Sequence, residues 1–87
     1  MNPTPYRLFL LRSAEQELDR LMRSDRERVE AAIAALADAP RPRGCKKMVA
    51  HEGYRVRVGA YRISYTIDDD TPVITVYRVS HQKDAYR

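Results

Sequence analysis

The sequence predicts an α+β domain with an N-terminal strand, an antiparallel helical hairpin and then a three-stranded antiparallel meander. This prediction rests on a change of hydrophobic period along the chain. Between residues 13 and 39, apolar residues recur at helical spacing. Between residues 54 and 67, apolar and polar residues alternate, as they do in half-buried strands, whereas residues 73–79 are nearly all apolar. Because each element then has one apolar side, we expect the helical hairpin to cover one face of the sheet.

The first half of the chain contains the predicted strand and the two helices. The strand runs from Tyr6 to Arg12, a nearly continuous apolar run typical of a well-buried strand. Two capping boxes then predict helix starts at Ser13 and Ser24. Pro40 ends the second helix after Ala39. The apolar stripes expected to face the sheet are Ala14, Leu18, Leu21 and Met22, and then Val29, Ala32, Ile33 and Leu36.

The meander is predicted from three runs of strand-forming residues, Tyr54 to Val58, Tyr61 to Ile67 and Val73 to Val79. The preceding residues, 40–53, contain proline and glycine and are expected to form a basic loop. A two-residue turn joins the first two strands, and Gly59 at its first position is typical of a type II′ turn. This turn fixes the register of the hairpin.

That register sets Arg57 directly opposite Arg62. The Tyr/Val/Ile face should meet the helices, so these two arginines and Arg55 should lie on the open face. Like charges opposed across two strands are destabilising, and a bound anion would relieve their repulsion. Arg78 joins Arg57 and Arg62 in a row if the last strand keeps its even positions on the same face, whereas a one-residue slip in register would turn Arg78 to the opposite face.

Size and composition limit the class of protein. We expect one domain over residues 1–87. The single cysteine, Cys45, cannot form an internal disulfide or a zinc cluster, which suits a reducing cytoplasm. No apolar run reaches the ~20 residues of a membrane span, and the N-terminal residues resemble a strand more than a signal peptide. We therefore expect a cytoplasmic protein with no membrane partner, no metal and no other cofactor.

The charge is divided unevenly along the chain. Residues 1–40 hold six Lys/Arg and seven Asp/Glu, whereas residues 41–87 hold ten basic and five acidic residues. Three of those five acids are consecutive, at Asp68, Asp69 and Asp70, where a turn is expected. The rest of the second half is strongly basic, which indicates a polyanion or an acidic protein as partner. Solubility alone is the alternative explanation.

The segments "YRVRVGAYRISYTIDDD" and "ITVYRVSHQKDAYR" resemble the RelE/ParE superfamily of bacterial toxins. The shared features are alternating basic residues, a glycine turn, a tyrosine-rich strand, an acidic turn and a last strand ending in a histidine, basic residues and a tyrosine. The resemblance spans essentially the whole chain. It implies a RelE-like single domain, a role as toxin of a type II toxin–antitoxin module, and neutralisation by a cognate acidic antitoxin.

The superfamily contains more than one activity. RelE-like toxins are ribosome-dependent endoribonucleases, or mRNA interferases, whereas ParE-like toxins inhibit DNA gyrase. We expect the RelE-like activity, cleavage of mRNA on the ribosome by 2′-hydroxyl attack and hence inhibition of translation. The alternatives are a gyrase inhibitor and a catalytically degenerate member that binds its antitoxin.

The resemblance also implies roles for individual residues. Arg57 and Arg62, with Arg55, would hold the scissile phosphate, because guanidinium groups suit phosphate oxygens. His81 would move the proton, since histidine is ordinarily the side chain that titrates near neutrality. Tyr86 would stack on a base or position the 2′-hydroxyl. The further residues expected to bind RNA or phosphate are Arg78, Lys83, Lys46 and Lys47.

One position departs from the ribonuclease pattern. Where several members of the superfamily carry a catalytic arginine, this chain has Gln82, followed by Lys83. Glutamine supplies neither charge nor a proton. Either His81 or Lys83 therefore takes over that role, or the toxin is slow or is not a ribonuclease.

Overall fold

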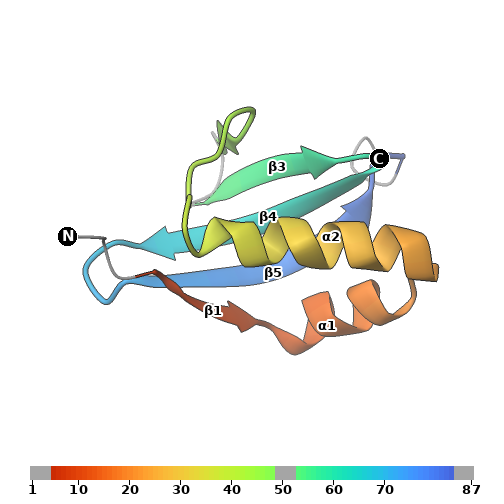
Figure 1. Cartoon of the computed structure of the whole chain (residues 1–87), viewed down its shortest axis with the longest axis horizontal. Helices are drawn as coiled ribbons and strands as arrows, with labels where there is room; N and C mark the ends of the chain where they lie inside the picture. Colours follow the sequence, from red (N-terminus) through yellow and green to blue (C-terminus); the bar gives the residue numbers. More distant parts are fainter. Residues whose placement is uncertain (1–4, 49–52, 84–87) are drawn as a thin grey trace.

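The computed structural model describes residues 5–48 and 53–83, which form two helices and a five-stranded sheet (Figure 1). The strands follow the order β1-β5-β4-β3-β2, with β1 parallel to β5 and the other neighbours antiparallel. This confirms the α+β prediction of a strand, two helices and a meander. The elements are β1 (Arg7–Leu10), α1 (Arg12–Asp19), α2 (Arg23–Leu36), β2 (Lys46–Lys47), β3 (Tyr54–Val58), β4 (Tyr61–Asp68) and β5 (Val73–His81).

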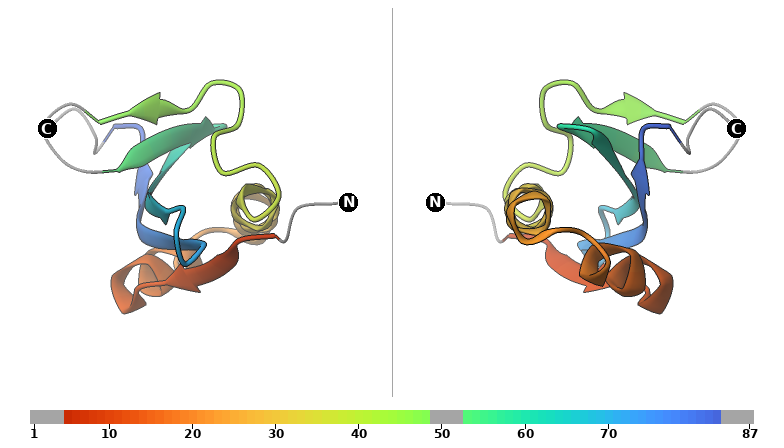
Figure 2. Two further views of the ribbon diagram at one scale, coloured as in Figure 1. Left: turned by 90° about the vertical axis from the view of Figure 1, so that its left-hand side faces the viewer. Right: turned by 90° about the vertical axis from the view of Figure 1, so that its right-hand side faces the viewer.

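The core lies between α2 and the sheet, with α1 at the β1–β5 edge (Figure 2). Tyr65 and Ile63 of β4 are fully buried there, together with Ile74 and Val76 of β5. The predicted second stripe faces this core, since Val29, Ile33 and Leu36 are buried and Ala32 packs against them. The described residues include no helix that is long and apolar enough to cross a membrane.

Both predicted helix starts are wrong by one or two residues. Leu11 and Met22 are the N-caps, and neither helix has a side-chain cap. Ser13 instead lies inside α1, and its hydroxyl donates a hydrogen bond to the carbonyl oxygen of Tyr77 at 3.3 Å. Met22 is 77% exposed, because it caps α2 and does not continue the apolar stripe of α1. The capping-box serines therefore do not determine where these helices begin.

The edge of β5 is shared between β1 and α1. Strand β1 pairs with β5 up to Val76, and its exposed Arg7 and Phe9 show that it is an edge strand, not the well-buried strand predicted. Beyond Val76 the edge is covered by α1, because Glu17 Oε1 accepts a hydrogen bond from the amide of Val79 at 2.8 Å. Helix α1 thereby satisfies backbone groups that another strand would otherwise bind.

The segment that joins α2 to β2 is held by a polar cluster at the C-terminal end of β4. Arg41 binds both carboxylate oxygens of Asp69, at 2.9 and 3.3 Å, and its guanidinium lies over the ring of Tyr54. Tyr6 also donates to Asp69. The hydrogen bonds from Arg41 and Tyr6 lower the pKa of the Asp69 carboxyl, and the Asp69 carboxylate raises the pKa of Tyr6. Tyr65 completes the anchor by donating to the carbonyl oxygen of Pro40 at 2.8 Å.

Candidate functional site

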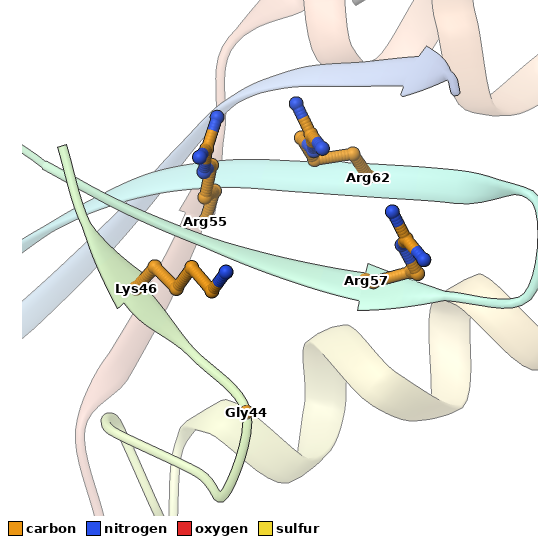
Figure 3. Close-up of a pocket in the computed structure, with 5 residues that line it drawn as sticks. All are labelled: Gly44, Lys46, Arg55, Arg57 and Arg62. Atoms are coloured by element: carbon orange, nitrogen blue, oxygen red, sulfur yellow. The ribbon is translucent and has the colours of Figure 1, made fainter. Parts of the chain in front are cut away.

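The face of β3 and β4 opposite α2 carries an open cavity of about 330 Å³. We call it the cation pocket. Figure 3 shows that four long basic side chains from three strands surround it, with the loop before β2 closing one side. Its lining residues are Gly44, Lys46, Arg55, Arg57 and Arg62.

Strand register explains why these side chains converge. Residues paired across neighbouring strands point to the same face of a sheet. Arg57 pairs with Arg62, as the Gly59 turn predicted, and Arg55 pairs with Lys46. Gly59 has φ 60°, and the following residue keeps a negative φ, which is the type II′ pattern. The predicted opposition of two arginines is therefore confirmed.

The lining of the cation pocket contains cations and no carboxylate. Ion pairs between described residues join Arg23 to Glu27 and Arg26 to Glu30 along α2, and Arg41 to Asp69. Arginine stays protonated at every physiological pH, so three of the lining charges are permanent. Such an arrangement is chemically suited to an oxyanion, and guanidinium forks can hold two oxygens of one phosphate.

A β-bulge places Arg78 on the same face as this pocket. Near the β4–β5 turn, Thr66 pairs with Thr75, so odd-numbered residues of β5 would face outward. The register shifts between Ser64 and Tyr65, and beyond it Ser64 pairs with Arg78. Tyr77 is the extra residue of the bulge. Without that residue Arg78 would point toward the helices. With it, Arg78 extends the row of Lys46 and Arg55, whereas Ser80 lies opposite Arg62, so the predicted row of Arg78 with Arg57 and Arg62 is wrong.

The same register places His81 on the opposite face. His81 pairs with Tyr61 and contacts its ring edge-on, with ring centroids 5.3 Å apart. Since Tyr61 belongs to the core-facing side, the expectation that His81 lies on the face of the arginines is wrong. Its Nδ1 accepts a hydrogen bond from the amide of Lys83 at 3.1 Å. Nε2 is the ring nitrogen left for further contacts.

His81 belongs instead to a smaller cavity of about 200 Å³ where the end of β5 meets α1. We call it the edge pocket. Its lining includes Glu17 and Arg20 from α1 or its C-cap, Tyr61 from β4, and Arg78, Ser80 and His81 from β5. Arg78 and Ser80 thus link this pocket to the face that carries the cation pocket.

The other predicted residues are dispersed. Lys47 pairs with Tyr54, which packs against the core, so it points away from the cation pocket although Lys46 lines it. Lys83 is exposed after the end of β5, and the backbone N–H of Gln82 donates a hydrogen bond to the carbonyl oxygen of Ala60 at 2.7 Å. Tyr86 lies outside the described residues. Gly44, which sequence reasoning missed, has φ 89°, and a glycine between proline-containing and basic residues is the signal that could have revealed this turn.

Comparison with protein families identifies a match over residues 8–86, to the family described as ParE toxin of the type II toxin–antitoxin system parDE. This match covers nearly the whole chain and confirms the resemblance to the RelE/ParE superfamily. A comparison with curated protein sequences gives no match.

Solved structures of RelE proteins share the fold. The RelE–RelB complex of Pyrococcus horikoshii aligns with a TM-score of 0.81 at 23% identity, covering 90% of this chain and 96% of that one. The intact RelBE complex of E. coli gives a TM-score of 0.76 at 23% identity, covering 87% and 95%. The RelBE2 complex of Mycobacterium tuberculosis gives 0.67 at 26% identity, covering 88% and 98%.

Proposed function

The chain belongs to the ParE toxin family of type II toxin–antitoxin systems, within the RelE/ParE superfamily, and we propose that it cleaves mRNA on the ribosome. The observation that carries this proposal is the convergence of Lys46, Arg55, Arg57 and Arg62 on one open cavity. Opposed arginines cost stability, and that cost is offset if the pocket binds a phosphodiester. The similarity of the fold to RelE toxins supports the same reading.

The reaction would be an internal transfer at phosphorus. The 2′-hydroxyl oxygen attacks the adjacent phosphorus and loses its proton, and the bond from phosphorus to the 5′ oxygen breaks. That oxygen takes up a proton, leaving a 2′,3′-cyclic phosphate and a 5′-hydroxyl end. Charge accumulates on the non-bridging oxygens, where Arg57, Arg62 and Arg55 would stabilise it. No metal is needed for this step.

Proton transfer is assigned separately from charge stabilisation. The three arginines of the cation pocket stay protonated and cannot act as a base. His81 and Lys83 are the two candidates that follow from the sequence, and His81 lines the edge pocket and not the cation pocket. In this proposal the cation pocket acts mainly as an electrostatic clamp. A group outside its lining moves the proton.

A second candidate function is inhibition of DNA gyrase. The family model that matches the chain describes ParE toxins of parDE systems, which favours this alternative. The presence of Gln82 where several ribonuclease members have arginine also weakens the ribonuclease reading. A member that has lost activity and retains antitoxin binding is the third possibility. Under either alternative the cation pocket would bind an acidic protein surface.

The partner would be a cognate antitoxin with an acidic segment that covers the cation pocket. RelE structures solved in complex with RelB antitoxins support an antitoxin as the partner. An acidic segment that folds on binding would neutralise the basic face. Its affinity should fall as the salt concentration rises, because several charge pairs form. Salt-independent binding on the outer surface of α2 would contradict this arrangement.

Two assays of the purified toxin test the proposed activity side by side. Toeprinting on ribosome-bound mRNA should reveal new 5′ ends that depend on the toxin and on the ribosome. A gyrase supercoiling assay at the same toxin concentration should show no inhibition. Arrest of gyrase without cleavage of mRNA would overturn the proposal and establish the ParE-like alternative.

A further inference from the structure

The edge pocket lies where β5 meets α1 and shares no lining residue with the cation pocket. Helix α1 packs along β5 (Figure 1), and its side chain Glu17 holds the strand by the amide of Val79. The pocket opens just beyond this contact. It draws residues from both faces of the sheet, because β5 is an edge strand there: Arg78 and Ser80 come from the basic face and Tyr61 and His81 from the other.

The chemistry of the lining is mixed and fits a nucleotide. Arg20 and Arg78 can only donate hydrogen bonds, and they carry permanent positive charge. Glu17 can only accept when ionised, and its Oε1 already accepts from Val79, which leaves Oε2 for a ligand. The ring of His81 is half-buried and set edge-on to that of Tyr61, and the Tyr61 hydroxyl is occupied by Asp25 at 3.4 Å.

Arg78 connects the two pockets. It pairs with Ser64 in the row that contains Arg55, and it also lines the edge pocket. Arg55 and Arg78 therefore lie on the same face, on either side of Ser64, so positive charge extends from the cation pocket to the edge pocket. Among the described residues no ion pair involves Arg78 or Arg20.

We propose that the edge pocket is a subsite for one single-stranded ribonucleotide that flanks the phosphate bound in the cation pocket. Its phosphate contacts Arg78 and Arg20, and its base lies against the ring of His81 with an edge toward Glu17. Unpaired bases are commonly held in this way, by stacking on aromatic or histidine rings and by hydrogen bonds to their edges. The subsite rests on the proposed ribonuclease function. It gives His81 a role in binding that does not require it to reach the scissile phosphate.

The role predicted for Glu17 is discrimination between bases. A carboxylate beside two arginines favours a base edge that presents an N–H donor next to an acceptor oxygen or nitrogen. A base that fails to satisfy both leaves a polar group of the pocket unpaired, which is costly. The edge pocket is therefore expected to contribute to the sequence preference around the cut.

A length series of uncleavable RNA tests the subsite. The full chain, labelled with ¹⁵N, is titrated with 2′-O-methyl oligoribonucleotides of two and three residues, the third added at either end. The dinucleotide should shift the amide signals of Arg57 and Arg62. One of the two trinucleotides should also shift Val79 and His81 and bind roughly 5- to 100-fold more tightly, the range expected for stacking one base.

Variants separate the subsite from the proposed function. Arg20→Ala should reduce the extra affinity for the trinucleotide, because one phosphate contact is lost, while the shifts at Arg57 and Arg62 remain. Arg23→Ala, which removes an exposed arginine near the start of α2, is the matched control and should behave as the wild type. Shifts confined to the cation pocket would overturn the subsite and leave the proposed function standing. Absence of shifts at both pockets would overturn RNA binding, and the subsite with it.

Discussion

Arg57 and Arg62 stand directly opposite each other across β3 and β4, and both line the cation pocket. A strand pair selected for stability alone would avoid this opposition, because like charges at directly paired positions repel. The neighbouring pair on the same face, Arg55 and Lys46, repeats it. The pairing of β2, β3 and β4 therefore places four basic side chains close together on the face that carries the cation pocket.

Removing one of the opposed charges should not destabilise the fold. Arg57 is exposed, and threonine preserves the strand propensity of its position. We expect Arg57→Thr to keep or slightly raise the free energy of unfolding, measured by urea denaturation, while toxicity in a growth assay is lost. Ile63→Ala is the contrasting variant, since truncating that fully buried side chain should cost about 2–5 kcal/mol. Full toxicity of Arg57→Thr at normal expression would contradict the assignment.

Two adjacent lysines provide a matched test of the basic face. Lys46 lines the cation pocket, whereas Lys47 points to the other side of β2. We expect Lys46→Ala to weaken binding of single-stranded RNA and to reduce the slope of log K against log[salt] by about 0.7, the value for one phosphate contact. Lys47→Ala should leave both the affinity and the slope unchanged. Equal effects of the two variants, measured by fluorescence anisotropy across a salt series, would show that binding does not use this pocket.

The ion pair between Arg41 and Asp69 should make stability depend on pH. Its hydrogen bonds lower the pKa of Asp69, so the stabilisation is fully present above the carboxyl's ordinary pKa of about 4. It is lost as the pH falls through the lowered value in the folded protein. We expect Asp69→Asn to have a lower urea midpoint than the wild type at pH 7, with the difference shrinking below about pH 4. If the difference in urea midpoint between Asp69→Asn and the wild type did not change with pH, the loss of stability would be due to packing and not to the ion pair.

Much of the meander could be predicted from the sequence, since the Gly59 turn and the alternation of side chains fix the register of β3 and β4. The bulge could not, because nothing in the run around Tyr77 distinguishes an extra residue from a regular one. Side chains alternate between the two faces along a strand, so a register that places Arg78 on the basic face must place His81, three residues later, on the opposite face. The predicted start of the first helix is wrong because Ser13 makes a tertiary contact: its hydroxyl donates to the carbonyl oxygen of Tyr77 and caps no helix. Strand β2 is two residues long and has no pattern of its own.

The proton step can be assigned by comparing two neighbouring residues. If His81 acts as the base, His81→Ala should slow cleavage by about 10²- to 10⁴-fold. If His81 instead holds a flanking base, His81→Phe should retain most of the rate and His81→Ala should mainly raise KM. Lys83→Ala is assayed in parallel. Full cleavage by both alanine variants would assign the proton to water, to the ribosome or to residues beyond those described.

The most direct test is the single-turnover rate of mRNA cleavage on purified ribosomes for wild type, Arg62→Ala and the control Arg23→Ala. Arg62 lines the cation pocket, whereas Arg23 is an exposed residue of α2 paired with Glu27. Loss of one group that stabilises charge in the transition state typically costs about 10²- to 10³-fold. We predict a loss of that size for Arg62→Ala and a rate within about twofold of the wild type for the control. Equal rates for all three proteins would contradict a phosphate clamp in the cation pocket.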